Sequence, residues 1–340
     1  MNFGWKESDF DGRETFSGGN DTRDVRRERL QIASAALGVA SVFLISLAVQ
    51  FVLVLIFQAV YPEAPGETWY VWVLSMLPMY GVAMPLSLLF FRLGKADAPE
   101  KKRIDALNLA ALFFFCFGMT YVGNLIGSLV NAWLSRILGT PIINDLENLT
   151  TNSPFWLNLV FCGILAPVLE EIFYRKLVID RLRRYGELPA MLISGITFGL
   201  IHGNFSQFFY AAMLGVVFGY IYLKTGKLRY SIGIHMAINL IGGVFSAELV
   251  KRLADILRDG AASIANILSV PVFGALYLGY VGFIVLCFVL LIPSALVLIF
   301  RFRSPLRRAE PPMTAKMWAK AGLLNPAVWL LAAVIVLLFL

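Results

Sequence analysis

The sequence predicts an all-α protein, a polytopic bundle of transmembrane helices, and three observations carry this prediction. Of the 340 residues, 59% are hydrophobic and 15% are charged, whereas a soluble domain carries about 25% charged residues. Apolar runs of the length needed to cross a bilayer, about 20 residues, recur along the chain. The loops between these runs are alternately rich and poor in Lys and Arg, as the positive-inside rule expects.

About nine apolar segments are expected to cross the membrane, and eight is the alternative. They lie at 33–60, 69–91, 106–134, 155–178, 188–203, 207–223, 230–247, 270–300 and 325–340. The fifth, sixth and ninth are short for a hydrocarbon core of about 30 Å. Basic residues concentrate before the first span and in the loops at 92–103, 175–184, 224–229 and 301–308. The N-terminus is therefore predicted to be cytoplasmic and the C-terminus to lie outside.

Two segments are polar or amphipathic and are not expected to cross the membrane. Residues 1–30 have mixed charge and several glycines, which predicts a mostly disordered cytoplasmic tail that becomes helical from Asp24 onward. Residues 248–268 place Leu and Ile at helical spacing with basic residues opposite. This pattern predicts an amphipathic helix along the outer membrane interface.

The charge and the cysteines exclude several other classes of protein. The net charge is +7, but most Lys and Arg residues sit in short loops where a membrane protein needs them. A nucleic acid partner is therefore not expected, and the lipid bilayer is. We expect a multi-pass protein of a bacterial-type plasma membrane. The three cysteines, Cys116, Cys162 and Cys287, lie inside apolar runs without a CxxC pair, so they are interpreted as packing residues.

The most unusual feature is a group of charges at the end of the fourth apolar run, in APVLEEIFYRKLV. A charged side chain at the centre of a membrane helix costs about 2.5–3.5 kcal/mol on a lenient scale. Glu171 and Arg175 are four residues apart, so they share a helix face and can pair. Glu170 is rotated by about 100° from Glu171 and is left to face a cavity.

Two later spans carry the two histidines of the chain. Phe198 and His202 are four residues apart in one of them, and His235 and Asn239 are four apart in another. A carboxylate in an apolar setting can take a proton from water, and imidazole and amide donors can hold the resulting oxyanion. There is no GxSxG motif. These residue types therefore indicate a hydrolase without a covalent nucleophile.

Three motifs occur in order on successive membrane segments: EExxxR at residues 170–175, FxxxH at 198–202 and HxxxN at 235–239. Together they resemble the CAAX protease and bacteriocin-processing family, which includes the type II CAAX prenyl endopeptidases. The resemblance covers roughly residues 150–247, as a catalytic core between N-terminal helices at 31–149 and an interfacial helix with C-terminal spans at 248–340.

The resemblance implies a glutamate-dependent intramembrane endopeptidase that acts on a peptide or protein substrate at the membrane. By position, Glu170 resembles the base that activates water, with help from His202. His235 and Asn239 resemble the pair that stabilises the oxyanion. The residues that resemble structural support are Glu171, Arg175 and Phe198.

Other functions remain open at the level of the sequence. Two histidines and a glutamate can hold a divalent metal with an open position for water, although HExxH is absent. No cofactor is expected, with a divalent metal as the alternative. The same fold can serve as a catalytically silent immunity or scaffold protein, and a transporter would use Glu170 as a proton carrier.

The depth of His202 sets a condition on any shared site. If the fifth span is straight, His202 falls nearer the outer side than Glu170 and His235. A shared site therefore requires a tilted fifth span, or a short, partly re-entrant hairpin over residues 188–223. The cavity is expected to open mainly toward the cytoplasm.

Overall fold

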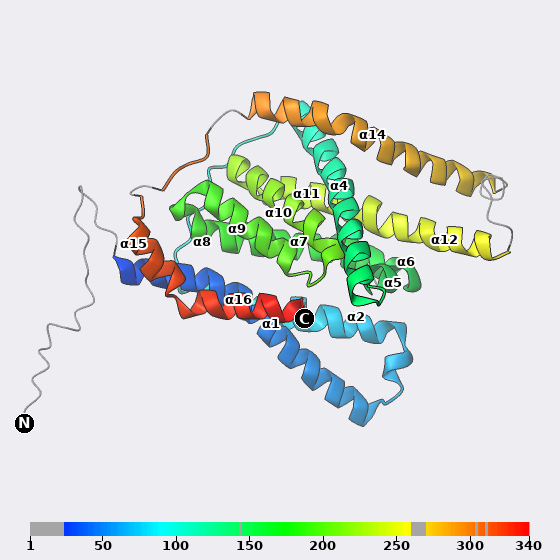
Figure 1. The fold of residues 1–340 in the computed structure, drawn as a ribbon, viewed down its shortest axis with the longest axis horizontal. Helices are drawn as coiled ribbons and strands as arrows, with labels where there is room; N and C mark the ends of the chain where they lie inside the picture. Colours follow the sequence, from blue (N-terminus) through cyan, green and yellow to red (C-terminus); the bar gives the residue numbers. More distant parts are fainter. Residues whose placement is uncertain (1–23, 143–144, 260–269, 303–304, 310–311, 340) are drawn as a thin grey trace, which may run out of the picture.

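The computed structural model describes residues 24–142, 145–259, 270–302, 305–309 and 312–339, and its regular elements are helices (Figure 1). Among these residues, seven helices are long and apolar enough to cross a membrane. They are α1 (Val25–Val60), Thr68–Phe91, α4 (Ala106–Leu138), Phe155–Tyr185, α10 (Phe205–Thr225), Leu228–Ile256 and α14 (Pro271–Arg301). The predicted all-α polytopic bundle is confirmed, and the chain is an integral multi-pass membrane protein.

Of the nine expected segments, two of the short ones do not form separate full-length helices, which favours the alternative of eight spans. The fifth is α9 (Glu187–Leu200), whose 14 residues reach only about 21 Å. The ninth, α16 (Pro326–Leu338), forms a pair bent by 60° with Ala315–Leu323, which contains α15 (Ala315–Trp318) and η8 (Ala319–Leu323). If this pair is one broken span, the described part of the chain has eight.

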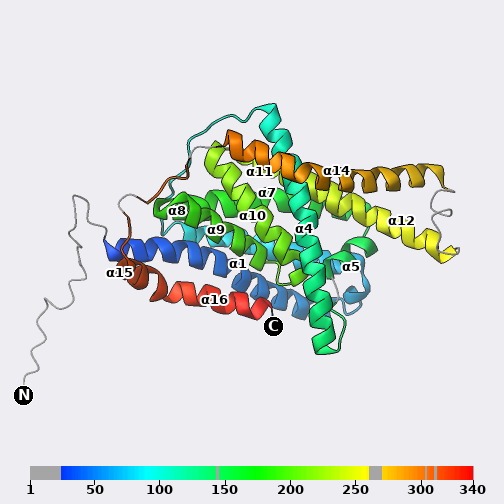
Figure 2. The ribbon, with the colours of Figure 1, turned by 45° about the horizontal axis from the view of Figure 1, so that its top comes forward.

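The α9 helix and α10 form a tight hairpin, which is the shorter of the two arrangements expected for residues 188–223. Gly203 takes a φ of 64° in the turn between them, a conformation that costs glycine little. Asn204 then caps α10, since its Oδ1 accepts a hydrogen bond from the Gln207 amide at 2.9 Å. In Figure 2, α9 and α10 lie side by side inside the bundle, between α1 and α11.

Three of the spans change from α to π geometry part-way along. The second span consists of α2 (Thr68–Met76), η3 (Leu77–Ala83) and α3 (Met84–Phe91). The fourth runs through α6 (Phe155–Leu157), η4 (Asn158–Leu165), α7 (Ala166–Glu171), η5 (Ile172–Ile179), α8 (Asp180–Leu182) and η6 (Arg183–Tyr185). The span that starts at residue 228 contains α11 (Leu228–Ile238), η7 (Asn239–Phe245) and α12 (Ser246–Asp259). Because π segments cluster at functional sites, these three spans are the place to look for one.

The predicted amphipathic helix at 248–268 is the direct continuation of the preceding span. The α12 helix follows η7 without a break, and the candidate span runs on to Ile256. An ion pair between Glu248 and Arg252, at 3.2 Å, lies on its surface. Residues 260–268 lie outside the described residues, and the predicted interfacial position stays a prediction.

The start of α1 is part of the folded bundle. The Asp24 carboxylate caps this helix by accepting a hydrogen bond from the Arg26 amide at 2.9 Å, so the expected helix from Asp24 onward is confirmed. Glu28 is buried, and its carboxylate accepts a hydrogen bond from the Tyr185 hydroxyl at 2.6 Å. Residues 1–23 of the predicted tail lie outside the described residues.

One end of the bundle is tied together by charged loops. Arg183 reaches both Glu187, at 2.9 Å, and Asp97, at 3.1 Å, and Arg307 also pairs with Asp97. In Figure 1 this end holds α8, α15 and the start of α1, whereas α5 (Asp145–Asn152) and the end of α12 lie at the opposite end. We call these the basic end and the far end.

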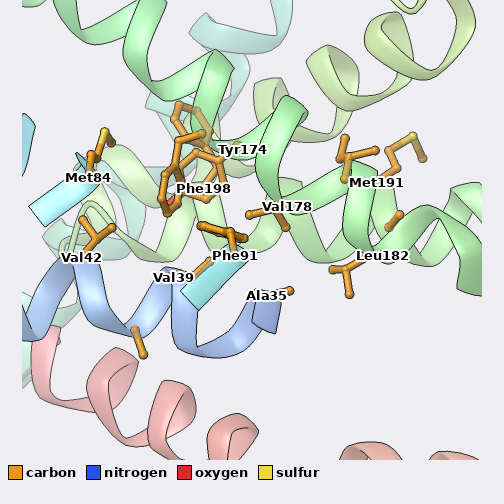
Figure 3. Packing of buried hydrophobic residues seen from close by; sticks show 14 of the residues in the cluster. Ala35, Val39, Val42, Met84, Phe91, Tyr174, Val178, Leu182, Met191 and Phe198 are labelled. Carbon is orange, nitrogen blue, oxygen red and sulfur yellow. The ribbon is translucent and has the colours of Figure 1, made fainter. Parts of the chain in front are cut away.

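The central hydrophobic core lies between α1, α3, η5 and α9. Its buried side chains include Val39, Phe91, Tyr174 and Phe198 (Figure 3). Phe91 packs edge-on against Phe173, with ring centroids 5.4 Å apart. This core surrounds the helix that carries the EExxxR motif, and so fixes its orientation.

The α4 helix crosses the hairpin steeply in Figure 1 and packs closely on α10. A Cβ atom added at Gly123 would lie 2.4 Å from the Cα of Tyr210. One added at Gly127 would lie 2.6 Å from the Phe205 carbonyl oxygen. Both contacts are with backbone, so the two glycines set how near α4 comes to α10, and with it which face of α4 remains open.

Candidate active site

The two adjacent glutamates of α7 lie in different surroundings. Glu171 is completely buried and accepts two hydrogen bonds from Arg175, at 3.0 Å from Nε and 3.2 Å from Nη2. The remaining nitrogen of the guanidinium, Nη1, donates a hydrogen bond to the Ser194 hydroxyl oxygen at 2.7 Å. The predicted pairing of Glu171 with Arg175 is therefore present, and it forms a closed, neutral unit.

Aromatic rings surround this unit. The Arg175 guanidinium lies 5.4 Å from the Phe198 ring centroid and 5.9 Å from those of Tyr174 and Phe218. Such rings attract a cation and exclude water. Removing one partner of a buried ion pair costs about 3–5 kcal/mol, because the other charge is left without compensation. The unit therefore holds the EExxxR helix in a single position.

Glu170 points instead toward a cavity and toward a different span. Its Oε1 accepts a hydrogen bond from the Tyr80 hydroxyl at 2.6 Å. Tyr80 belongs to η3, in the proline-flanked stretch LPMYGVAMP. Nothing in the spacing of the polar motifs points to Tyr80, since the bond joins residues 90 positions apart. The signal in the sequence that could have pointed to Tyr80 is the pair of prolines that interrupt this apolar helix.

His235 lies between the two glutamates. Its Nε2 is 3.7 Å from Glu170 Oε2, and its Nδ1 is 3.3 Å from Glu171 Oε1, although neither contact is aligned as a hydrogen bond. The imidazole stacks on Phe218 at 5.2 Å and meets the edge of Phe198 at 5.7 Å. The ring is thus held so that one nitrogen faces each carboxylate.

His202 is oriented by the turn that ends α9. Its Nδ1 lies 2.8 Å from the Phe198 carbonyl oxygen. A carbonyl can only accept a hydrogen bond, so Nδ1 carries a proton, and in the neutral imidazole Nε2 keeps a lone pair. Phe198 also meets the His202 ring edge-on at 5.2 Å. This one phenylalanine therefore contacts both imidazoles and the Arg175 guanidinium.

Asn239 begins η7 and joins it to η4. Its amide nitrogen donates a hydrogen bond to the Cys162 carbonyl oxygen at 2.9 Å. That bond uses one of the two amide hydrogens, so the second is available to a ligand. The two π segments thus approach each other at the residue that the HxxxN motif singled out.

All four side chains predicted to be catalytic, together with Phe198 and Tyr80, line one cavity of about 740 Å³. The four are Glu170, His202, His235 and Asn239. Glu171 and Arg175 lie behind its wall. The roles assigned to these residues from the motifs stay predictions, but the chain does bring them to one place.

The cavity extends toward the far end of the bundle, and whether it opens toward the cytoplasm, as expected, depends on which end faces the inside of the cell. Its wall continues along the end of α2, the middle of α4, the first half of α10, and the segments α5 and α12. Toward the basic end, the buried Glu171–Arg175 unit and the rings of Tyr174 and Phe173 fill the bundle.

The alternative that two histidines and a glutamate hold a divalent metal can be compared with the arrangement of these side chains. Among the residues that the structure describes, no group of three or more His, Cys, Asp or Glu side chains has an arrangement that could hold a metal ion.

A polar stripe on α4 also faces the cavity. Thr120, Asn124 and Ser128 all line it. They follow one another at four-residue intervals, which places them on one face of the helix. This spacing can be read from the sequence, in TYVGNLIGS, and it is a second signal of a polar interior.

The segment that builds this site matches a known family. Residues 152–241 match the family model described as type II CAAX prenyl endopeptidase Rce1-like. The resemblance to the CAAX protease and bacteriocin-processing family is confirmed. The match contains all three motifs, the π segments η4 and η5, and the first three residues of η7. It leaves out the spans that carry Tyr80 and the polar stripe of α4.

Three relatives are similar over parts of their length. "Putative membrane peptidase YdiL" of Bacillus subtilis (strain 168) is 27% identical over 97 residues, which are 28% of this chain and 40% of that protein. The membrane-embedded CAAX protease MroQ of Staphylococcus aureus (strain USA300) is 28% identical over 107 residues, 28% of this chain and 43% of that protein. The UPF0177 protein YbdJ of Lactococcus lactis subsp. lactis (strain IL1403) is 26% identical over 142 residues, 39% of this chain and 59% of that protein.

The matched segments thus span about half the length of these curated relatives. No solved structure matches the chain.

Proposed function

We propose that this chain is an intramembrane endopeptidase that hydrolyses peptide bonds of membrane-associated peptides with a water molecule activated by Glu170. One observation carries the proposal. The Glu170 carboxylate lines a polar cavity between a tyrosine hydroxyl and an imidazole, while the adjacent Glu171 is neutralised by Arg175. The similarity to proteins named as membrane peptidases supports the same reaction class.

The proposed reaction begins with a proton transfer. Glu170 takes a proton from a water molecule in the cavity, and the hydroxide adds to the carbonyl carbon of the substrate. Tyr80 holds Oε1 of the carboxylate, which leaves Oε2 to act as the base. His202 has a lone pair on Nε2 that can accept the other hydrogen of the same water and orient it.

The next steps use His235 and Asn239. The carbonyl oxygen becomes an oxyanion as the tetrahedral intermediate forms. The imidazole of His235 and the second amide hydrogen of Asn239 are the donors proposed to stabilise it. Protonated Glu170 then gives its proton to the leaving nitrogen and the C–N bond breaks. Glu170 returns to its ionised form, and no covalent bond to the protein forms at any step.

The basic end of the bundle is proposed to face the cytoplasm, with the N-terminus on that side. Its loops carry most of the Lys and Arg residues, which is the bias that sets orientation. The cavity would then be reached from outside the cell or from the membrane. Labelling by a membrane-impermeant thiol reagent should reach Thr151→Cys in intact cells and should not reach Lys224→Cys.

A cleavage assay in proteoliposomes tests the proposed activity. A library of synthetic peptides is offered to the wild type, Glu170→Ala and His202→Ala, with Leu129→Ala as a control at an exposed side chain that does not line the cavity. We expect cleavage by the wild type and the control, and a loss of at least about 100-fold in Glu170→Ala.

The other candidate functions give different results in this assay. Equal turnover by Glu170→Ala would exclude the mechanism. Absence of cleavage by the wild type, with a phenotype that survives Glu170→Ala in cells, would favour the scaffold or immunity role. Loss of cleavage on strong chelation would favour a metal-dependent protease.

A further inference from the structure

The polar side chains of α4 that line the cavity, Thr120, Asn124 and Ser128, have few hydrogen-bond partners among the described residues. Among the described residues, neither the Asn124 amide nor the Ser128 hydroxyl has a hydrogen-bond partner. Thr120 donates its hydroxyl proton to the Cys116 carbonyl oxygen at 2.9 Å, which leaves its oxygen able to accept a bond. Polar side chains in a membrane helix face the bundle interior or a cavity and mark a pathway or a site. The stripe therefore calls for a polar occupant.

The helix packing prevents these side chains from turning elsewhere. Gly123 and Gly127 precede Asn124 and Ser128 by one residue each, and both meet the backbone of α10 within 2.6 Å of an added Cβ. Asn131, one turn further on, donates a hydrogen bond to the Ser206 hydroxyl at 2.6 Å. These contacts fix the rotation of α4, so the stripe stays about 100° away from the α10 contact and faces the cavity.

The spacing of the stripe fits an extended peptide. Residues four apart on a helix are separated by about 6 Å along its axis. Alternate residues of an extended chain are separated by about 6.7 Å. Three side chains at this interval can therefore reach three backbone groups that all point the same way from one extended strand. Asn124 can donate and accept, as a peptide backbone requires.

The stripe also leads to the proposed catalytic group. Cys116, one turn before Thr120, packs in the same buried cluster as Leu214 and Ile238. Those two residues line the cavity beside His235. The stripe therefore starts near the imidazole and continues along the cavity wall.

The charge of the cavity restricts the side chains of the occupant. Among the described residues that line it, none is a lysine or an arginine, and Glu170 and Glu147 are both acidic. An acidic side chain would enter a low-dielectric space with no cation to pair with and with like charge nearby. A neutral or basic side chain meets no such penalty.

From these features we infer that the Thr120–Asn124–Ser128 stripe is a substrate subsite, which holds the backbone of an extended peptide segment with neutral or basic side chains while its scissile bond lies at Glu170. This inference rests on the proposed endopeptidase function. It adds a binding surface outside the segment that matches the family model.

Backbone methylation tests the inference. A peptide that the wild type cleaves is synthesised as a series in which one backbone amide at a time is N-methylated. The series is compared in the wild type, Asn124→Leu and Leu129→Ala, all in proteoliposomes and all shown by thermal unfolding to be folded. If Asn124→Leu does not fold, Ser128→Ala takes its place.

We expect one N-methyl position to lower kcat/KM by about 3- to 10-fold in the wild type and in Leu129→Ala. In Asn124→Leu, kcat/KM for the unmethylated peptide should already be lower than in the wild type by a similar factor. The same N-methyl group should then cause no further decrease in kcat/KM in this variant. Replacing a residue near that amide by Glu should lower cleavage, and replacing it by Lys should not. An equal cost of every N-methyl group in all variants would overturn the inference while leaving the proposed function intact.

A binding measurement separates the two proposals in the other direction. If the wild type cleaves no member of the peptide library, a library peptide that binds is given a fluorophore and N-methylated in the same way, and the series is titrated onto Glu170→Gln and onto Glu170→Gln with Asn124→Leu. Binding that is weakened by one N-methyl group and by Asn124→Leu, with no cleavage by the wild type, would contradict the proposed activity and support the subsite. Equal binding of all peptides to both variants would contradict the subsite.

Discussion

Glu170 and Glu171 are consecutive residues of one helix, and the structure places them in opposite situations. Glu171 is enclosed, receives both hydrogen bonds of a bidentate arginine pair and has no access to the cavity. Glu170 lines the cavity, holds one bond from Tyr80 and faces an imidazole at 3.7 Å. The difference shows how a membrane protein can keep one carboxylate reactive, because a rotation of about 100° separates a structural charge from a chemical one.

The buried pair can be broken from the arginine side. Arg175→Met fills a similar space but removes the permanent cation beside Glu171 and leaves only the His235 imidazole, at 3.3 Å, near this buried carboxylate. We expect a loss of about 3–5 kcal/mol in the free energy of unfolding. Thermal unfolding in detergent measures it. An unchanged unfolding temperature would mean that water reaches Glu171, and the contrast between the two glutamates would then disappear.

The reactive carboxylate can be loosened without removing it. Tyr80→Phe deletes the hydroxyl that bonds to Glu170 Oε1, and hydrogen bonds to charged groups contribute about 1.5–3 kcal/mol. We expect kcat to fall by about 10-fold or more while KM changes little, because Tyr80 positions the base. If KM rises instead and kcat is preserved, Tyr80 contacts the substrate and does not position Glu170.

The wall opposite the glutamates can be displaced. Gly123→Ala puts a methyl group 2.4 Å from a backbone atom of α10, and overpacking of this kind costs about 1–3 kcal/mol. We expect a lower unfolding temperature and weaker cleavage together. Gly282→Ala is the matched control, since a Cβ there meets nothing within 4 Å. A harmless Gly123→Ala would show that α4 and α10 can separate freely.

The solvent-exposed carboxylate of Asp105 is expected to give the smallest change in stability of the variants considered. The Asn108 backbone amide, helped by Arg301, lowers the pKa of Asp105, which caps α4. A lowered pKa contributes stability above the unfolded value of about 3.9, and this contribution is lost as the pH falls through the folded pKa. The small difference in unfolding temperature between the wild type and Asp105→Ala should therefore vanish in acid. A difference that persists below that range would show that Asp105 acts other than by its charge.

The sequence was sufficient for features that depend on local spacing. The i, i+4 rule predicted the Glu171–Arg175 pair, and the shortness of residues 188–203 pointed to the hairpin that brings His202 inward. Contacts across the chain were not readable, because Tyr80 and Glu170 lie 90 residues apart. The direction of the cavity also depends on which end the aromatic rings fill, and helix counting contains no information about that.

The most direct measurement compares two isosteric variants, Glu170→Gln and Glu171→Gln, for peptide cleavage and for thermal unfolding side by side. We predict that the two variants affect different quantities. Glu170→Gln should unfold near the wild-type temperature but lose cleavage by at least about 100-fold. Glu171→Gln should unfold at a clearly lower temperature. Full cleavage by Glu170→Gln, or equal effects of both variants on both quantities, would contradict it.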